Sequence, residues 1–163
     1  MIFGDGGHAK VIRDINIVPE GAWVVAIGDN HIRKKEALEL LRNWKLLEMD
    51  SKFGVAIHPF SSVSPKAKIG EGSVICAGAV ICADAVIGKH CIINTCASVD
   101  HDSVLQDFVH IAPGAHLCGG VQVGEGGFVG TGVCLPPGFK LAEWTLIKAR
   151  RFKPEDYVGI IRV

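Results

Sequence analysis

Aliphatic residues recur at every sixth position over more than half of this 163-residue chain. A small residue, usually Ala, Ser or Cys, often stands two positions before the aliphatic one. Neither the helical period of 3.6 nor plain strand alternation gives a spacing of six. A repeat fold does, if each six-residue rung is a short strand followed by a tight corner. The fifteen positions are Val63, Ile69, Ile75, Ile81, Ile87, Ile93, Val99, Leu105, Ile111, Leu117, Val123, Val129, Leu135, Leu141 and Ile147.

Three such rungs complete a triangular coil of eighteen residues, so the fifteen rungs make five coils. The aliphatic residue of each rung fills the interior, and the small residue before it lets the corner close. Stacked coils place residues eighteen apart side by side, with about 4.8 Å between neighbouring strands. The pattern therefore predicts a mainly β fold, with a parallel β-helix over residues 58–149.

The first 57 residues carry no six-residue period and alternate short apolar runs with helical patterns. We expect strands at 2–3, 23–27 and 53–57 and helices at about 8–16 and 31–49. Strand alternating with helix is typical of a small parallel α/β sheet. The chain is thus expected to consist of an α/β domain at 1–57, the β-helix at 58–149 and a C-terminal tail at 150–163.

In the second expected helix, the apolar residues Ala37, Leu38, Leu41 and Trp44 are expected to lie on one side. Arg33 and the lysines near it are expected to form the solvated face of the same helix.

Charge and composition narrow the possible partners. Seventeen basic residues balance seventeen acidic ones, so no overall field favours nucleic acid or an anionic membrane. No apolar run approaches the roughly 20 residues that span a bilayer, and the N-terminus lacks the features of a signal peptide. We therefore expect a cytoplasmic protein. The six cysteines show no CxxC spacing and are expected to act as small buried hydrophobes.

A glycine-rich turn follows the first expected strand. Gly4-x-Gly6-x-x-Ala9 opens a helix, and glycines there let backbone N–H groups approach a phosphate at the helix N-terminus. The alternative is a tight strand–helix turn with no ligand. His8 beside it either donates a hydrogen bond to such a ligand or packs locally.

A histidine between two aspartates carries the second candidate chemistry. His101 follows the core residue Val99 by two positions, so its side chain is expected to project outward near a corner, beside Asp100 and Asp102. A histidine held by a carboxylate is a standard general base near neutral pH. The alternative is a surface histidine with acidic neighbours.

The spacing of the histidines bears on metal binding. His90, His101, His110 and His116 do not differ by eighteen, so no two share a column, and no metal site is predicted within one chain. Zinc at a junction between subunits remains an alternative.

Five motifs together resemble the bacterial sugar acyltransferases of the sialic-acid O-acetyltransferase (NeuD) type. That group includes N-acetyltransferases acting on nucleotide-linked amino sugars. The resemblance covers nearly the whole chain and implies a left-handed β-helix, a homotrimer with active sites between the prisms, and acetyl-CoA as cosubstrate. The motifs are Gly4-Asp5-Gly6-Gly7-His8-Ala9-Lys10, Ala26-Ile27-Gly28-Asp29-Asn30, Ile57-His58-Pro59, Val99-Asp100-His101-Asp102 and Phe108-Val109-His110-Ile111-Ala112-Pro113-Gly114-Ala115.

The resemblance also implies roles for matching residues. His101 is the expected base and Asp102 its orienting carboxylate, while the backbone N–H of Gly119 is expected near the thioester oxygen. The remaining expected contacts are His110, Thr131 and Ala149 with acetyl-CoA, and Gly6, Gly7, His8 and Gly28 with the nucleotide part of the sugar substrate.

Two departures from the family pattern keep alternatives open. A βα segment with an acidic pair, which relatives carry before the second strand, is absent between Asp14 and Trp23, and the last coil is shortened. The main hypothesis is acetyl-CoA-dependent N-acetylation of a nucleotide-linked amino sugar. The alternatives are sugar O-acetylation, a catalytically weak binding module, a γ-carbonic-anhydrase-like metalloenzyme and a nicotinamide oxidoreductase.

Overall fold

The computed structural model describes residues 2–4, 6–7, 9–10, 13, 20–49 and 51–149. His8, most of the helix expected at 8–16 and the tail expected at 150–163 lie outside the described residues.

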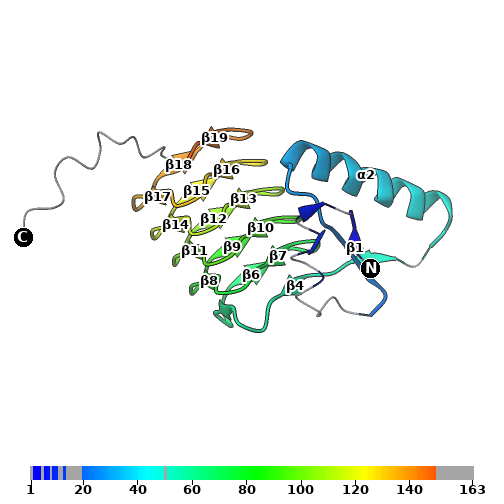
Figure 1. Cartoon of the computed structure of the whole chain (residues 1–163), viewed down its shortest axis with the longest axis horizontal. Helices are drawn as coiled ribbons and strands as arrows, with labels where there is room; N and C mark the ends of the chain where they lie inside the picture. The colour runs from blue at the N-terminus through cyan, green and yellow to red at the C-terminus, as the bar shows by residue number, and fades with distance from the viewer. Residues whose placement is uncertain are drawn as a thin grey trace, which may run out of the picture.

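The six-residue period builds a parallel β-helix of about five turns, consistent with the left-handed β-helix fold (Figure 1). Every rung is a two-residue strand, and each strand from β4 to β16 pairs in parallel with the strand eighteen residues further on, as Ile92 does with His110. The strands are β4 (Ala56–Ile57), β5 (Ser62–Val63), β6 (Lys68–Ile69), β7 (Val74–Ile75), β8 (Val80–Ile81), β9 (Val86–Ile87), β10 (Ile92–Ile93), β11 (Ser98–Val99), β12 (Val104–Leu105), β13 (His110–Ile111), β14 (His116–Leu117), β15 (Gln122–Val123), β16 (Phe128–Val129), β17 (Cys134–Leu135), β18 (Lys140–Leu141) and β19 (Leu146–Ile147).

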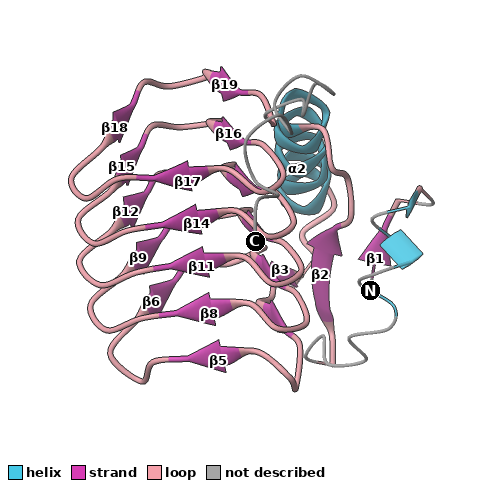
Figure 2. Ribbon diagram, turned by 60° about the vertical axis from the view of Figure 1, so that its left-hand side comes forward, coloured by secondary structure: helices cyan, strands magenta, loops and turns pink. Residues whose placement is uncertain are grey.

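These strands form the three faces of a prism (Figure 2). The first sheet contains β4, β7, β10, β13, β16 and β19; the second contains β5, β8, β11, β14 and β17; the third contains β6, β9, β12, β15 and β18. The chain runs from the first sheet to the second and then the third in each turn, so every turn has three corners.

The predicted register of the core is confirmed. None of the fifteen aliphatic side chains is exposed, and only Val63, Ile69 and Ile147, near the two ends, are partly rather than fully buried. The small residues before them, such as Ala79 and Ala97, are buried as well. This stacked apolar interior is the main source of stability of the prism.

From Gly72 to Trp144, each corner contains a residue in the left-handed region, and these residues stack in columns eighteen apart. The corner from the third sheet to the first uses Gly72, His90, Phe108, Gly126 and Trp144, with φ between 52° and 74°. Glycine adopts this conformation freely, whereas a bulky side chain there is strained and persists only where packing holds it. Three aromatic or imidazole rings in this column are held by the N-terminal part of the chain.

The N-terminal part is a three-stranded parallel sheet, order β1-β2-β3, with one long helix beside it. Its elements are β1 (Ile2–Phe3), β2 (Ala22–Val25), β3 (Lys52–Phe53) and α2 (Asn30–Leu46). Asp29 caps α2, because its side chain accepts a hydrogen bond from the backbone N–H of Ile32. This part lies along one side of the β-helix (Figure 1, Figure 2).

Two expectations for this region need correction. The single strand expected at 53–57 is two strands, because the chain leaves the N-terminal sheet at Gly54 and β4 pairs with β7 of the β-helix. Leu38 and Leu41 of α2 are exposed, since the buried side of the helix follows Asn30, Arg33, Ala37 and Trp44 instead. The division into domains at residue 57 stays a prediction.

The cysteines are only in part the buried residues that were expected. Cys76 and Cys91 are buried, but Cys96 stands at an outer corner and Cys134 on the outer side of β17, and both are exposed. In a two-residue strand the residue before the core position points outward.

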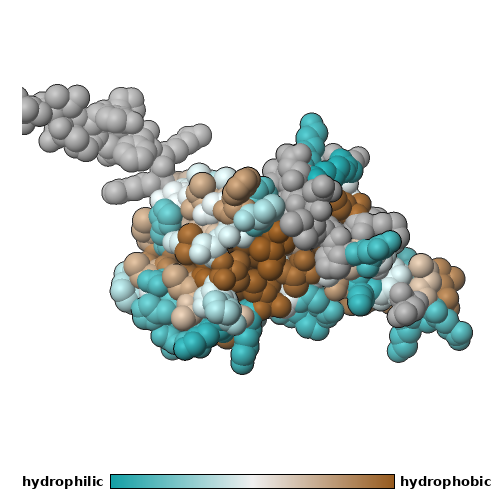
Figure 3. Space-filling model, turned by 90° about the horizontal axis from the view of Figure 1, so that it is seen from below, coloured by the Kyte–Doolittle hydropathy of each residue, from teal (hydrophilic) through white to brown (hydrophobic). Residues whose placement is uncertain are grey.

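Apolar surface also occurs on the outside of the molecule, and one face shows it gathered near the middle (Figure 3). The large apolar residues that are exposed include Ile32, Leu38, Leu41, Phe60, Val104 and Leu146. In the described part of the chain, no helix combines the length and the hydropathy that crossing a membrane requires.

Candidate functional site

His101 and Asp102 form a hydrogen-bonded pair at the corner between β11 and β12. Nδ1 of His101 lies 2.7 Å from Oδ2 of Asp102. Both side chains are more than half exposed, at 62% and 68%. The outward projection expected for His101 is therefore confirmed, and its ring can be reached from solvent.

The backbone of this corner explains why the pair forms. Asp102 takes the left-handed position, with φ of 58°, a conformation that aspartate tolerates better than most residues. One carboxylate oxygen of Asp100 accepts a hydrogen bond from the backbone N–H of His101 at 2.8 Å. The hydrogen bond to Asp102, and next the charge of Asp100, raise the pKa of His101 above its ordinary value of 6.5.

A carboxylate can only accept, so Nδ1 of His101 carries the hydrogen and Nε2 keeps its lone pair. The neutral ring therefore presents a proton acceptor on the side away from Asp102. This is the tautomer that a general base requires.

Gly119 lies directly against the ring of His101, one coil further along the prism. A Cβ atom built at Gly119 would be only 2.6 Å from Cε1 of His101, so no larger residue fits without moving the ring. In the described part of the chain, nothing accepts a hydrogen bond from the backbone N–H of Gly119. The structure thus brings together His101, Asp102 and Gly119.

His110 and Gly28 form a second group, on the first sheet and under the N-terminal part. His110 is buried, with 7% of its surface exposed. Its Nδ1 lies 3.1 Å from the carbonyl oxygen of Gly28, and its Nε2 lies 3.1 Å from Nδ2 of Asn94. Because the carbonyl only accepts, Nδ1 is the protonated nitrogen and Nε2 accepts from Asn94.

Arg33 fixes this second group, a role that the sequence analysis missed. Its side chain is buried, with 1% of its surface exposed, and not solvated as expected. All five of its N–H bonds find acceptors: the carbonyl oxygens of His90, Ile27, Gly28 and Phe108 and the side-chain oxygen of Asn30. Burial lowers the pKa of Arg33 to about 10. The guanidinium therefore ties α2 and the Gly28 turn to the β-helix.

The other predicted contacts lie apart from these two groups. Thr131 and Ala149 are exposed and stack at the corner between the first and second sheets, whereas His101 stands at the corner between the second and third. Gly6 and Gly7 are exposed, and a Cβ atom at either would meet nothing within 4 Å. One chain therefore brings some of the predicted residues together but does not gather all of them.

No protein-family model matches the chain, but solved structures do. The acetyltransferase domain of PglB from Neisseria gonorrhoeae is 32% identical and superimposes with a TM-score of 0.81, over 91% of this chain and 87% of that one. PerB from Caulobacter crescentus, in complex with CoA and GDP-perosamine, is 34% identical with a TM-score of 0.79, over 91% and 84%. The chain belongs to the hexapeptide-repeat acetyltransferases that act on sugars.

The fold extends to a more distant protein. WeeI from Acinetobacter baumannii is 21% identical and superimposes with a TM-score of 0.53, over 85% of this chain. At that identity the likeness concerns the fold alone.

One alternative hypothesis was a γ-carbonic-anhydrase-like metalloenzyme, which requires a metal site. Among the residues that the structure describes, no three His, Cys, Asp or Glu side chains are grouped as metal ligands would be. His90 is enclosed by the rings of Phe53 and Phe108, with centroids at 4.5 and 5.1 Å. In this hexapeptide-repeat acetyltransferase it acts as a packing residue.

Proposed function

We propose that this chain transfers the acetyl group of acetyl-CoA to the amine of a nucleotide-linked amino sugar, with His101 as general base. The observation that carries the proposal is the arrangement of His101, Asp102 and Gly119 at an accessible corner. The family supports it: PerB was solved with CoA and GDP-perosamine, and the PglB domain was also solved with acetyl-CoA.

The chemistry follows from the atoms of that corner. The sugar amine attacks the thioester carbonyl carbon and forms the new C–N bond, while Nε2 of His101 takes the proton that the amine loses. The backbone N–H of Gly119 donates to the oxyanion that develops on the carbonyl oxygen. Collapse of the intermediate breaks the C–S bond, and the proton goes to the departing CoA sulfur.

Asp102 acts through His101. Its carboxylate holds Nδ1–H at 2.7 Å, which keeps Nε2 unprotonated and stabilises the imidazolium that forms. The described part of the chain places no cysteine or serine side chain in hydrogen-bond contact with the His101 ring. Direct transfer in a ternary complex is therefore favoured over a covalent acetyl-enzyme.

The separation of the predicted contacts supports a homotrimer. His101 stands at one corner of the prism, His110 lies on the first sheet, and Thr131 and Ala149 stand at another corner. We propose that neighbouring prisms complete the site, with Thr131, Ala149 and His110 along the acetyl-CoA path. Under this proposal the protein is a cytoplasmic trimer of α/β domain and β-helix.

The N-terminal part is the proposed holder of the nucleotide. Gly6 and Gly7 are exposed with open space around them, so a phosphate can approach their backbone N–H groups. Gly28 belongs to this part, and its carbonyl oxygen accepts hydrogen bonds from Arg33 and His110. His8, the fourth residue proposed here, lies outside the described residues.

The test is release of CoA in the presence of acetyl-CoA and a panel of sugars. The panel pairs nucleotide-linked amino sugars with their hydroxyl counterparts and with the free sugars. Turnover with the linked amino sugars alone is the expected result. Turnover with a hydroxyl sugar such as sialic acid would identify an O-acetyltransferase of the NeuD type, and no turnover with any sugar would leave a binding module.

A further inference from the structure

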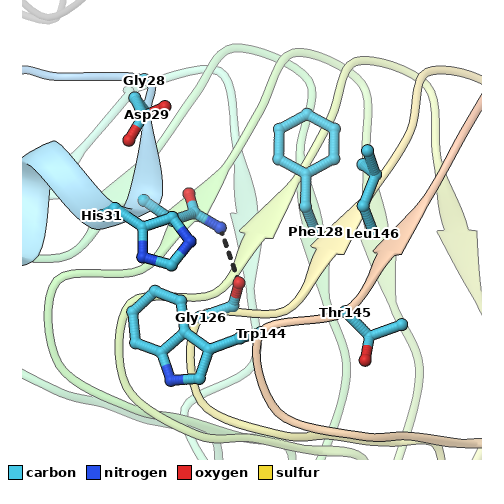
Figure 4. A pocket seen from close by; sticks show the side chains of 9 residues that line it. Gly28, Asp29, His31, Gly126, Phe128, Trp144, Thr145 and Leu146 are labelled. Atoms are coloured by element: carbon cyan, nitrogen blue, oxygen red, sulfur yellow. Dashed lines mark hydrogen bonds between the residues drawn. The ribbon is translucent and has the colours of Figure 1, made fainter.

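A cavity of about 410 Å³ opens where the N-terminus of α2 meets the last two coils (Figure 4). Its size falls within the range of small-molecule sites, and apolar and ring-bearing side chains make up much of its wall. The residues around it are Gly28, Asp29, Asn30, His31, Gly126, Phe128, Trp144, Thr145 and Leu146. None of the catalytic groups proposed above belongs to it.

Flat rings form two walls of this cavity. The rings of His31 and Trp144 stack with centroids 4.4 Å apart and an angle of 22° between their planes. Phe128 and Leu146 lie on the other side of the space (Figure 4). A flat apolar group inserted here would contact ring surface, an interaction that every nucleobase can make.

The walls are fixed before any ligand arrives. Gly126 leaves the room that Trp144 fills, because a Cβ atom at Gly126 would be 2.2 Å from the indole. The side-chain amide of Asn30 donates to the carbonyl oxygens of Gly126 and Gly127 at 3.0 and 3.3 Å. These hydrogen bonds hold the start of α2 against that corner of the β-helix. Such preorganisation reduces the entropy that a ligand loses on binding.

The charges of the lining residues indicate which part of a nucleotide-linked sugar this cavity can bind. No lysine or arginine is among the lining residues, so the lining supplies no cationic side chain to a phosphate. Its one carboxylate, Asp29, uses Oδ1 to accept from Ile32 at 2.9 Å. Within the described residues nothing donates to Oδ2, which is therefore left to accept from a ligand N–H.

We infer that this cavity binds the nucleobase of the nucleotide-linked sugar, an inference that rests on the proposed function. Uracil and thymine carry a ring N–H on their base-pairing edge, and guanine carries two adjacent N–H groups on that edge. Adenine has an unprotonated ring nitrogen at that position and donates only from its amino group, so a carboxylate binds the adenine of CoA less favourably than uracil, thymine or guanine. Asp29 is thus the specificity-determining residue.

The position of the cavity suits this assignment. Gly28 is at its rim and accepts a hydrogen bond from His110, and the ring of Phe128 meets His110 edge-on at 4.7 Å. A base held in the cavity leaves its diphosphate and sugar outside it, next to the Gly28 turn.

Isothermal titration calorimetry with uridine diphosphate, guanosine diphosphate and adenosine 3′,5′-diphosphate tests the inference without requiring turnover. Asp29→Asn keeps an oxygen that caps α2 but replaces the free carboxylate oxygen, His31→Ala removes one ring, and Glu39→Gln on the exposed side of α2 is the matched charge control. We expect uridine or guanosine diphosphate to bind, with its Kd raised about tenfold by Asp29→Asn and by His31→Ala. Glu39→Gln should leave both Kd values unchanged.

Three results would overturn the inference. These are no binding of either pyrimidine or guanine nucleotide, Kd values within twofold of wild type in Asp29→Asn and His31→Ala, or weakening confined to adenosine 3′,5′-diphosphate, which would assign the cavity to CoA. Failure of the proposed function would show separately, as no release of CoA from acetyl-CoA with any sugar of the panel.

Discussion

Nδ1 of His101 lies 2.7 Å from Oδ2 of Asp102, although the two residues are neighbours in sequence and share one corner of the β-helix. A left-handed backbone at Asp102 turns its carboxylate back toward the preceding ring. The pair is accessible, and Gly119 of the next coil lies against the ring. A base, its orienting carboxylate and a free N–H donor are therefore assembled by residues close to one another on a rigid prism.

The first prediction concerns pH. The pKa of His101 is raised by Asp102 and Asp100, so the base is protonated and inactive below a pKa that lies above 6.5. kcat should therefore fall as the pH drops through that pKa. Asp102→Asn removes the main cause of the shift, so the acidic limb of the pH–rate profile should move to lower pH, with a reduced plateau. A limb that stays in place in Asp102→Asn would show that Asp102 does not set the pKa of the base.

The second prediction concerns the contact between Gly119 and His101. Gly119→Ala places a Cβ atom where Cε1 of His101 lies, so the ring must move. We expect kcat to fall by about 10²-fold, because an error of roughly 1 Å in a reacting group has that effect. The melting temperature should change little, since His101 is exposed. A kcat within threefold of wild type would contradict the placement of the ring.

The third prediction concerns the acid stability of the fold. His90 is buried among aromatic rings, and burial lowers its pKa to about 4, well below the 6.5 of the unfolded chain. The unfolded state therefore binds an extra proton between pH 6.5 and about 4, so stability must fall as the pH falls through this window. The expected loss between pH 7 and pH 5 is about 2 kcal/mol.

His90→Phe isolates this effect. Phe108 occupies the same left-handed position one coil further on, so a phenyl ring is compatible with the corner. Denaturant unfolding at pH 7 and at pH 5 should show a flatter pH dependence in the variant than in wild type. Equal slopes would place the titrating group elsewhere.

Sequence alone predicted the β-helix well, because a period of six is enforced by every coil. If one rung were misplaced, a core side chain such as Ile93 or Leu117 would point outward, so the six-residue spacing has to hold in every coil. The His101–Asp102 pair was also predictable, since it depends on adjacent residues and one corner. The outward direction of the His101 side chain was predictable too, because His101 follows the core residue Val99 by two positions in the sequence.

The roles of Arg33 and Gly28 were not predictable in that way. Arg33 bonds to carbonyl groups 57 and 75 residues away, and Gly28 meets His110 across 82 residues. These contacts depend on how α2 docks on the prism, which no local period encodes. The sequence held one signal of this contact. Asn30, Arg33, Ala37 and Trp44 follow helical spacing and share the buried side of α2. A charged residue on a buried side requires hydrogen-bonding partners.

The fourth prediction concerns the glycine-rich turn. Gly7 is exposed and a side chain there meets nothing within 4 Å, so Gly7→Val should leave the fold intact. If phosphate approaches this turn, the variant should raise the KM for the nucleotide sugar and leave the KM for acetyl-CoA unchanged. An unchanged KM for the sugar would make the turn a structural connection without a ligand.

The most direct measurement is CoA release from acetyl-CoA and a nucleotide-linked amino sugar, at saturating substrates, by wild type, His101→Ala and His116→Ala. His116 is an exposed histidine on β14 that hydrogen-bonds Ser98 at 2.9 Å, so it controls for loss of a surface imidazole. We predict that His101→Ala lowers kcat by about 10²–10⁴-fold, the usual contribution of a general base, while His116→Ala does not. A His101→Ala enzyme that keeps more than about a third of wild-type kcat would contradict the assignment of His101 as the base.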